Sequence, residues 1–399
     1  MPADAYQIDI SLLRTHSEGI ANDDARGVSG RYRANTTQAN PTNISLIFNA
    51  IGGAIVDAEN NSFESTLIYN GVSVQVGKYL AGVGTGSIGL FDLIQQVDGE
   101  GIAEPIVRGY TFLSRNYEPG DDIITVGFSR GAAAARCLAG FVLGQGLLNP
   151  ANYHPENKTS AYLRGVAAWY KYRQGQPNLA KYENLTNVFL QLGEIVPDLT
   201  DTDFVPVERI LAVGVFDTVS SMGLPRPAID GLDYDFILAD TVLNSKVLNG
   251  YHALSADEDR ANFHPTYWTP RHNITQVIFP GSHSDVGGGY VQTGLSDRPL
   301  EWMLTNLRAQ GLRFDVSNIR QLQPLATAIG HDDGISIPWN ALPRSPRVFP
   351  VDLFEGAPSF RADASIGERW GKAITLLPGQ RAGTYKSTGA FADRRALYP

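Results

Sequence analysis

Residues 127–131 read Gly-Phe-Ser-Arg-Gly, so that a serine stands between two glycines. An apolar run, 123–128, precedes Ser129, and an alanine-rich helical pattern follows it. On a tight strand-to-helix turn a serine projects its oxygen above the sheet, and the glycines on either side let the strand and the helix approach. The N-terminus of the helix favours negative charge, which makes the amide of Arg130 the expected first oxyanion donor. The pattern predicts that Ser129 is the nucleophile of a hydrolase.

A serine hydroxyl is a poor nucleophile unless a base and an orienting carboxylate assist it. With this type of turn, the acid and then the histidine follow the serine, on loops at the C-terminal ends of later strands. Asp217 ends the apolar run 209–216, and His283 follows the run 274–279 in a glycine-rich loop. We therefore predict Asp217 as the acid and His283 as the base.

Four further residues stay open as alternatives or additions. His252 is a rival base, but its segment reads as helical, which favours a packed or hydrogen-bonded role. Asp285 is a rival acid, although two residues after His283 it is better placed to shape the loop. The second oxyanion donor is expected from the backbone of Asn49 or Ala50, because the glycines that follow let N–H groups face a ligand.

The elements that position these residues alternate short apolar runs with helical patterns. Strands are expected at 44–51, 72–80, 123–128, 209–216 and 274–279, with a weaker one near 347–351. Helices are expected at 104–116, 131–142 and 300–310. The alternation predicts an α/β fold of the α/β-hydrolase type, in which helices cover both faces of a mainly parallel central sheet.

No linker divides the chain, so a single domain is expected, with its core at about 44–315. Residues 143–208 exceed the length of a simple crossover and predict a helical cap or insertion. Residues 316–399 then form a C-terminal extension.

Composition narrows the class of protein. The 399 residues are 43% hydrophobic and carry a net charge of −9, which supports a large core and argues against a nucleic-acid partner. The lone cysteine, Cys137, excludes an internal disulfide and a cysteine-based zinc site and is expected in the core. Residues 1–40 lack the pattern of a secretory signal, so the chain is expected to be made in the cytoplasm. The predicted chemistry requires neither a metal nor an organic cofactor.

An ordered set of motifs surrounds the predicted nucleophile. They lie at 81–85, 119–121, 127–131, 214–219, 251–254, 265–268 and 281–290. In these motifs, over about residues 44–315, the chain resembles the α/β-hydrolase domain of type VI secretion phospholipase effectors and their relatives.

The resemblance implies a lipase or phospholipase whose Ser-Asp-His triad falls on Ser129, Asp217 and His283. It also implies an ester or phospholipid substrate, transient contact with a membrane surface, a secretion or immunity partner, and export by a contact-dependent system. Asn49 stands where the family has the aspartate of an Asp-Gly-Thr motif. The family's effectors often carry a large membrane-binding region, for which residues 316–399 leave little room. Hydrolysis of small esters, or a catalytically silent interaction protein, therefore remain alternatives.

Overall fold

The structure is a computed structural model that describes residues 8–13, 40–59, 62–81, 103–174, 197–219, 242–335, 343–349 and 360–391. Its centre is a nine-stranded sheet with the order β13-β10-β9-β8-β5-β1-β4-β3-β2. In that order the strands are Phe360–Ala362, Ile274–Phe279, Val247–Ser255, Ile210–Phe216, Asp122–Phe128, Ile8–Leu13, Val72–Leu80, Ser62–Tyr69 and Ala54–Glu59. The strands β1 and β13 lie outside the range 44–315 that was expected to form the core.

The sheet is half parallel and half antiparallel. Neighbouring strands from β13 to β5 run parallel, whereas each pair from β5 to β2 is antiparallel. The expectation of a mainly parallel sheet is therefore wrong for the β1 to β4 half. The expected strands 72–80, 123–128, 209–216 and 274–279 are confirmed as β4, β5, β8 and β10.

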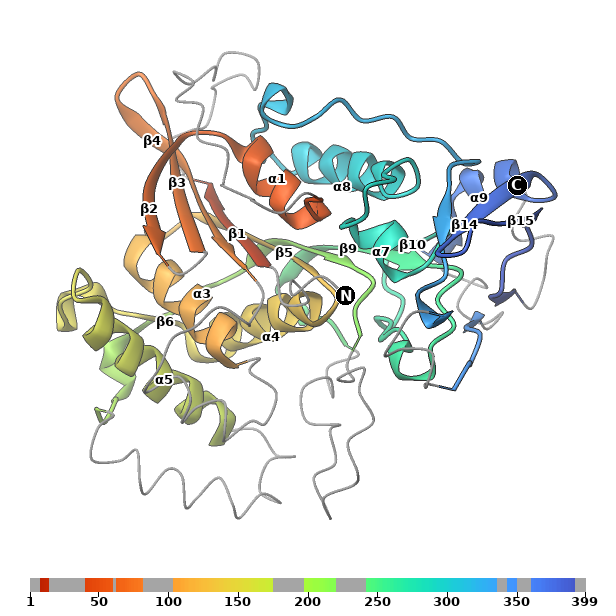
Figure 1. Cartoon of the computed structure of the whole chain (residues 1–399). Coiled ribbons are helices and arrows are strands. Elements are labelled where there is room, and N and C mark those ends of the chain that lie inside the picture. The colour runs from red at the N-terminus through yellow and green to blue at the C-terminus, as the bar shows by residue number, and fades with distance from the viewer. Residues whose placement is uncertain are drawn as a thin grey trace.

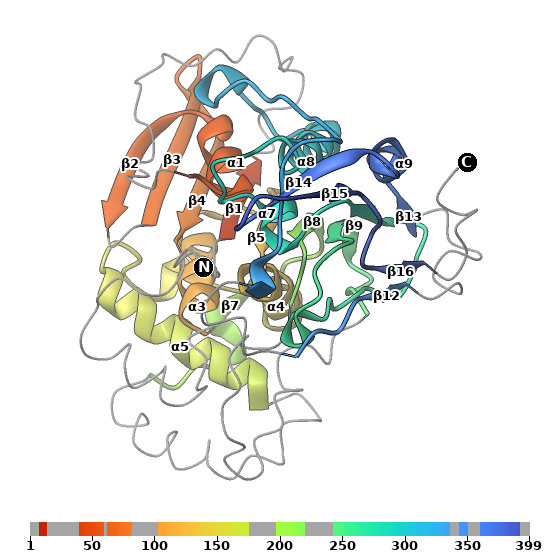
Figure 2. The same ribbon diagram turned by 45° about the vertical axis from the view of Figure 1, so that its right-hand side comes forward.

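Helices cover both faces of the sheet, as Figures 1 and 2 show. On one face lie α3 (Ala103–Asn116), α4 (Arg130–Gln145) and α5 (Lys158–Gln174), and on the other α1 (Asn43–Ile51), α7 (His283–Gly287) and α8 (Asp297–Ala309). Side chains of β8 alternate between two cores: Val213 and Val215 join the α4 side, and Ala212 and Phe216 the α8 side. This alternation is what a strand buried on both faces requires.

Residues 44–51 form a helix, so the strand expected there is wrong. A short, mainly apolar run such as this one fits a buried strand and a buried helix equally well. Thr42 resolves the ambiguity by capping the helix, because its carbonyl accepts from the Leu46 amide at 3.1 Å and its hydroxyl from Ser45. The side chain of Asn43 then ties α1 to the other helices of its face through the carbonyls of Val286 and Ser296.

Smaller elements complete the described chain. They are β6 (Leu147–Leu148), β7 (Phe204–Val205), β11 (Gly330–His331), β12 (Val348–Phe349), β14 (Ala373–Leu377), β15 (Arg381–Thr384), β16 (Ala390–Phe391), α9 (Ala364–Arg369) and the 3-10 turns Pro150–Asn152, Asp201–Asp203, Ala261–Phe263, Val316–Asn318 and Asp333–Ile335. Within the insertion 143–208, α5 is helical, and residues 175–196 lie outside the described part. Cys137 is half-buried against the core. Among the described helices, none is both long and apolar enough to cross a bilayer.

Candidate active site

The candidate residues follow strands that end at one edge of the sheet. Parallel pairing of β5, β8, β9 and β10 brings their C-terminal ends together. Ser129 follows the last residue of β5 and Asp217 the last residue of β8, while His283 is the first residue of α7, shortly after β10. Residues that are 66 and 154 positions apart in sequence thereby become neighbours.

Ser129 occupies a strained turn between β5 and α4. Its φ is 59°, a backbone conformation that residues other than glycine rarely adopt. The turn is fixed on both sides, because the Ser129 amide donates to Phe216 O at 3.0 Å and the Ser129 carbonyl accepts from Ala132. A Cβ on Gly127 would lie 2.2 Å from the carbonyl oxygen of Gly131. Glycine is thus required at 127, as the sequence pattern predicted.

A hydrogen-bonded chain joins the three predicted residues. The distance from Ser129 Oγ to His283 Nε2 is 2.8 Å, and that from His283 Nδ1 to Asp217 Oδ2 is 2.6 Å. A carboxylate only accepts, so the pairing with Asp217 puts the imidazole proton on Nδ1. That leaves Nε2 to accept from the serine hydroxyl. All three side chains are buried, with exposed fractions of 3%, 2% and 0% for Ser129, His283 and Asp217.

Two aromatic rings hold the imidazole in place. The ring of Phe128 lies 4.6 Å from that of His283, and the ring of Phe263 meets it edge-on at 5.2 Å. Phe128 can lie there because position 287 is glycine, where a Cβ would come within 2.1 Å of the phenyl ring. The amide of His283 also donates to Glu258 Oε2. Ring orientation and backbone position are therefore both constrained.

Asp217 is held by a buried arginine. Arg347 Nη1 donates to Asp217 Oδ1 at 2.6 Å and Nη2 to Oδ2 at 2.9 Å, and the Ser255 amide also donates to Oδ1 at 2.9 Å. Burial alone would raise the pKa of Asp217, but the Arg347 charge and the bond from His283 hold that pKa well below its usual range. Asp217 is consequently an anion at neutral pH, as an acceptor for the imidazole N–H must be.

His252, the rival base, lies in the strand β9 and not in a helix. Its Nε2 accepts from the Thr218 amide at 3.2 Å, so Nδ1 carries the proton and faces Gln276 Oε1 at 3.3 Å. Burial and the charge of Arg136 lower the pKa of His252 to about 3. Both ring nitrogens are engaged, and the ring is a neutral packed side chain.

Asp285, the rival acid, bonds to His331 and to backbone amides and not to the imidazole of His283. Its Oδ2 accepts from the amides of Ser282 and His331, which caps α7 and anchors β11. Its Oδ1 lies 2.6 Å from His331 Nδ1. His331 is itself buried, since only 9% of it is exposed. Asp285 therefore shapes the loop, which was its favoured role.

The two sides of the expected oxyanion site differ in outcome. Arg130 is the first residue of α4, so its amide lies at the positive end of the helix, next to Ser129. Asn49 and Ala50 lie near the end of α1, where amides bond to the carbonyls one turn earlier. Residues 49–51 belong to this helix and not to the expected loop, so the amides of Asn49 and Ala50 are bonded within it. The structure does not describe residues 82–102, which include most of the motif at 81–85.

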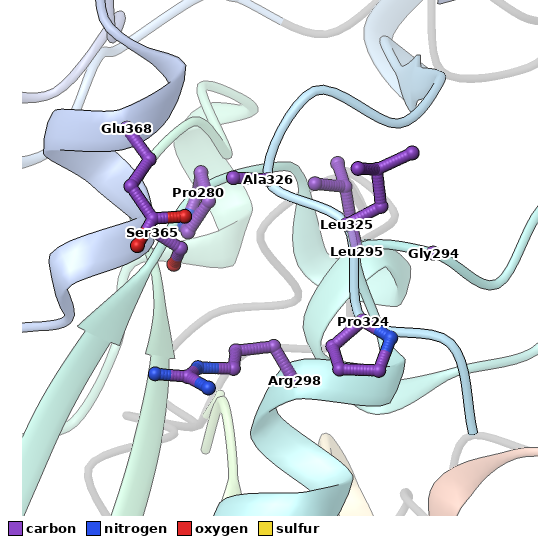
Figure 3. Close-up of a pocket in the computed structure, with 9 residues that line it drawn as sticks. All are labelled: Pro280, Gly294, Leu295, Arg298, Pro324, Leu325, Ala326, Ser365 and Glu368. Atoms are coloured by element: carbon purple, nitrogen blue, oxygen red, sulfur yellow. The ribbon is translucent and has the colours of Figure 1, made fainter.

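A small cavity of about 70 Å³ lies between α8, α9 and residues 324–326 (Figure 3). Arg298 of α8 and Ser365 and Glu368 of α9 supply its polar lining, and Pro280 borders it on the side of β10. None of its described lining residues is Ser129, Asp217 or His283. The cavity is therefore separate from the hydrogen-bonded chain.

Sequence reasoning missed Arg347, Ser255 and Phe263. Ser255 and Phe263 lie close to the motifs at 251–254 and 265–268 but outside them, and Arg347 follows Asp217 by 130 residues. Of the weak strand expected at 347–351, the structure describes residues up to 349, and Val348–Phe349 form β12. The expected strand gave no hint of a buried cation. Only their positions in the folded chain reveal these three residues.

Comparisons with known proteins agree with the motifs. Residues 28–306 match the family model described as "T6SS, Phospholipase effector Tle1-like, catalytic domain". The chain is 31% identical over 179 residues to the uncharacterized protein YEL023C of Saccharomyces cerevisiae, which covers 43% of this chain and 22% of that protein. The chain thus spans less than a quarter of that relative's length.

Two solved structures are also similar. An uncharacterized protein from Pseudomonas aeruginosa is 17% identical, covering 72% of this chain and 45% of its own, with a TM-score of 0.31. The Tle1 effector bound to the VgrG spike of the type 6 secretion system is 21% identical, covering 63% and 41%, with a TM-score of 0.29.

Proposed function

The chain belongs to the Tle1-like family of type VI secretion phospholipase effector catalytic domains, and from this premise we propose that it is a serine carboxylic-ester hydrolase acting on phospholipids. Ser129 is the nucleophile, His283 the base and Asp217 the residue that orients it. The fold is of the α/β-hydrolase type, as one domain with an insertion at 143–208 and an extension at 316–399.

The reaction runs through an acyl-enzyme. Ser129 Oγ attacks the ester carbonyl carbon while its proton moves to His283 Nε2, and the carbonyl oxygen becomes an oxyanion beside the Arg130 amide. Collapse of this intermediate breaks the bond to the leaving alcohol, which takes the proton from Nε2. Water then attacks the acyl carbon in the same way, gives its proton to Nε2, and releases the acid as Ser129 recovers its hydrogen.

One observation carries the proposal: the serine, imidazole and carboxylate are joined at 2.8 and 2.6 Å in the order that acyl transfer needs. The strained φ of Ser129 and the anionic state of Asp217 support it further. Backbone strain of this kind costs about 1–3 kcal/mol and persists where the surrounding structure enforces it.

The substrate and partners follow from the family. We propose a phospholipid ester at a membrane surface, delivery by a type VI secretion spike, and an immunity protein in the producing cell. A spike partner is suggested by the similar Tle1 effector, which is bound to VgrG.

A fluorophosphonate probe tests the nucleophile, and an ester panel tests the substrate. The probe should label the wild type and a Ser160→Ala control, which changes a serine of α5, but not Ser129→Ala. The panel compares p-nitrophenyl butyrate with phosphatidylglycerol and phosphatidylethanolamine vesicles. Turnover of the soluble ester alone would support the small-ester alternative. An unlabelled, folded wild type would leave only a non-catalytic role.

A further inference from the structure

We infer that Arg347 is a positioning residue of this site, which holds Asp217 in place and sets the charge around the Asp217–His283 pair. The inference rests on the proposed function of Ser129, Asp217 and His283. Arg347 lies beyond residue 306, where the family match ends. The C-terminal extension thus contributes a residue without which the site is incomplete.

The geometry is that of a two-pronged clamp. The two Nη atoms of Arg347 each donate to a different oxygen of Asp217. Nη1 also donates to Ser255 O at 2.7 Å, and Nη2 to Phe263 O at 2.8 Å. The guanidinium plane is therefore fixed at four points, with only 1% of the residue exposed. A planar fork of donors matches a carboxylate in a way that a lysine ammonium cannot.

The clamp also reaches the imidazole from a second direction. Phe263, whose carbonyl accepts from Arg347, packs its ring edge-on against His283. Ser255, whose carbonyl also accepts from Arg347, donates its amide N–H to Asp217 Oδ1. Ser255, which bonds to Asp217, and Phe263, which packs against His283, are thus both tied to one guanidinium.

The remaining charged and titratable groups in this region come from several elements. His283 comes from α7 and His252 from β9, while Glu258, Arg260 and Tyr267 lie between β9 and β10. Glu258 is paired with Arg260 by two bonds of 2.7 Å. Among the described arginines, Arg260 is thus paired with Glu258, and Arg347 is the one that contacts Asp217 directly.

Removal of this cation has a defined electrostatic sign. Without Arg347 the Asp217 anion stabilises the protonated imidazole more strongly, or Asp217 itself takes up a proton more readily. Either change moves the acid limb of the kcat/KM profile to higher pH. A purely structural role would lower stability and leave that limb where it is.

The test compares Arg347→Met with Arg369→Met. Arg369 is an equally buried arginine of the same extension, but it donates to the carbonyls of Ala326 and Ala328. For hydrolysis of p-nitrophenyl butyrate, Arg347→Met should lower kcat by about 100-fold, because small displacements of catalytic groups are costly. Its acid limb should rise by about one pH unit. Arg369→Met should leave the acid limb unchanged.

Two further variants keep the test decisive if Arg347→Met does not fold. Arg347→Lys keeps the charge but loses the fork, so kcat should fall by about tenfold while the acid limb stays within a few tenths of a unit. In an Asp217→Asn background, Arg347→Lys should change kcat by less than about threefold, because coupled residues are not additive. Full additivity in this cycle would overturn the inference.

Failure of the inference and failure of the proposed function give different results. The titration midpoint of the His283 ring, followed by NMR, does not require catalysis. The role of Arg347 would be refuted if the probe labels the wild type while the Arg347 variants keep the wild-type kcat, acid limb and His283 ring midpoint. An unlabelled wild type whose ring midpoint still rises in Arg347→Met would refute the proposed function and retain the clamp.

Discussion

Replacement of Gly127 by alanine tests whether the packing of β5 against α4 positions Ser129, the proposed nucleophile. The new Cβ would lie 2.2 Å from Gly131 O and 2.7 Å from Ala132 Cα, whereas real Cβ atoms essentially never come within 3.0 Å of a neighbour. The carbonyl must therefore retreat by about 0.8 Å. Gly131 belongs to the first turn of α4, so the movement carries Ser129 with it.

The displacement predicts a large loss of activity with a modest loss of stability. A misplacement of about 1 Å at reacting groups costs about 100-fold in rate, and overpacking costs about 1–3 kcal/mol of unfolding free energy. We expect Gly127→Ala to lower both kcat/KM and the rate of fluorophosphonate labelling by about this factor, with a small decrease in Tm. Gly383→Ala is the matched control, because its Cβ meets nothing within 4 Å.

A folded Gly127→Ala protein with wild-type labelling and turnover would refute this reasoning. It would mean that the turn at Ser129 is held by the bonds to Phe216 and Ala132 alone. An equal loss in Gly383→Ala would show that the effect is not local.

Two further substitutions test the acid and the buried rival base. Asp217→Asn should lower kcat by about 10⁴-fold, because Arg347 will bind the amide oxygen and turn the NH₂ group toward His283, which imposes the wrong tautomer; a near-normal rate would exclude Asp217 as the orienting acid. His252 has a pKa of about 3 in the folded chain against about 6.5 when unfolded, so the unfolded state binds more protons between these values and stability falls with pH below 6.5. Between pH 6.5 and pH 5, the free energy of unfolding measured in urea should fall by about 2 kcal/mol more for the wild type than for His252→Gln. Equal losses would contradict a neutral buried His252.

Much of the β5 to β10 half of the fold was predictable. Its strands are short apolar runs bounded by glycine, proline or aspartate, and such boundaries fix where a strand ends. The residue after each end was therefore predictable too, including Ser129 and Asp217. The region 44–51 was not, because hydrophobicity alone does not separate a buried helix from a buried strand, and the cap at Thr42 decided it.

The other half of the sheet shows a second limit. The strands β1, β2 and β3 were not expected, and β1 inserts in antiparallel orientation between β4 and β5. For β1 the pairing partners depend on contacts between segments far apart in the chain, which no local pattern encodes. The β3–β4 hairpin differs, because its two-residue turn at Asn70 and Gly71 is a local signal that was overlooked. His252 illustrates the same point as β1, since its short segment read as a helix but pairs on both sides within the sheet.

The sequence by itself determined the turn at Ser129, because its requirements are local: glycine where strand and helix touch, and serine at a left-handed position between them. It also predicted the order in which the proposed acid and base follow. Only the tertiary structure decided that Asp217 and not Asp285 meets the imidazole, that Asn49 and Ala50 are bound within a helix, and that Arg347 clamps the acid. Those outcomes depend on which strand ends and loops converge at one edge of the sheet, and the chain must fold before that edge exists.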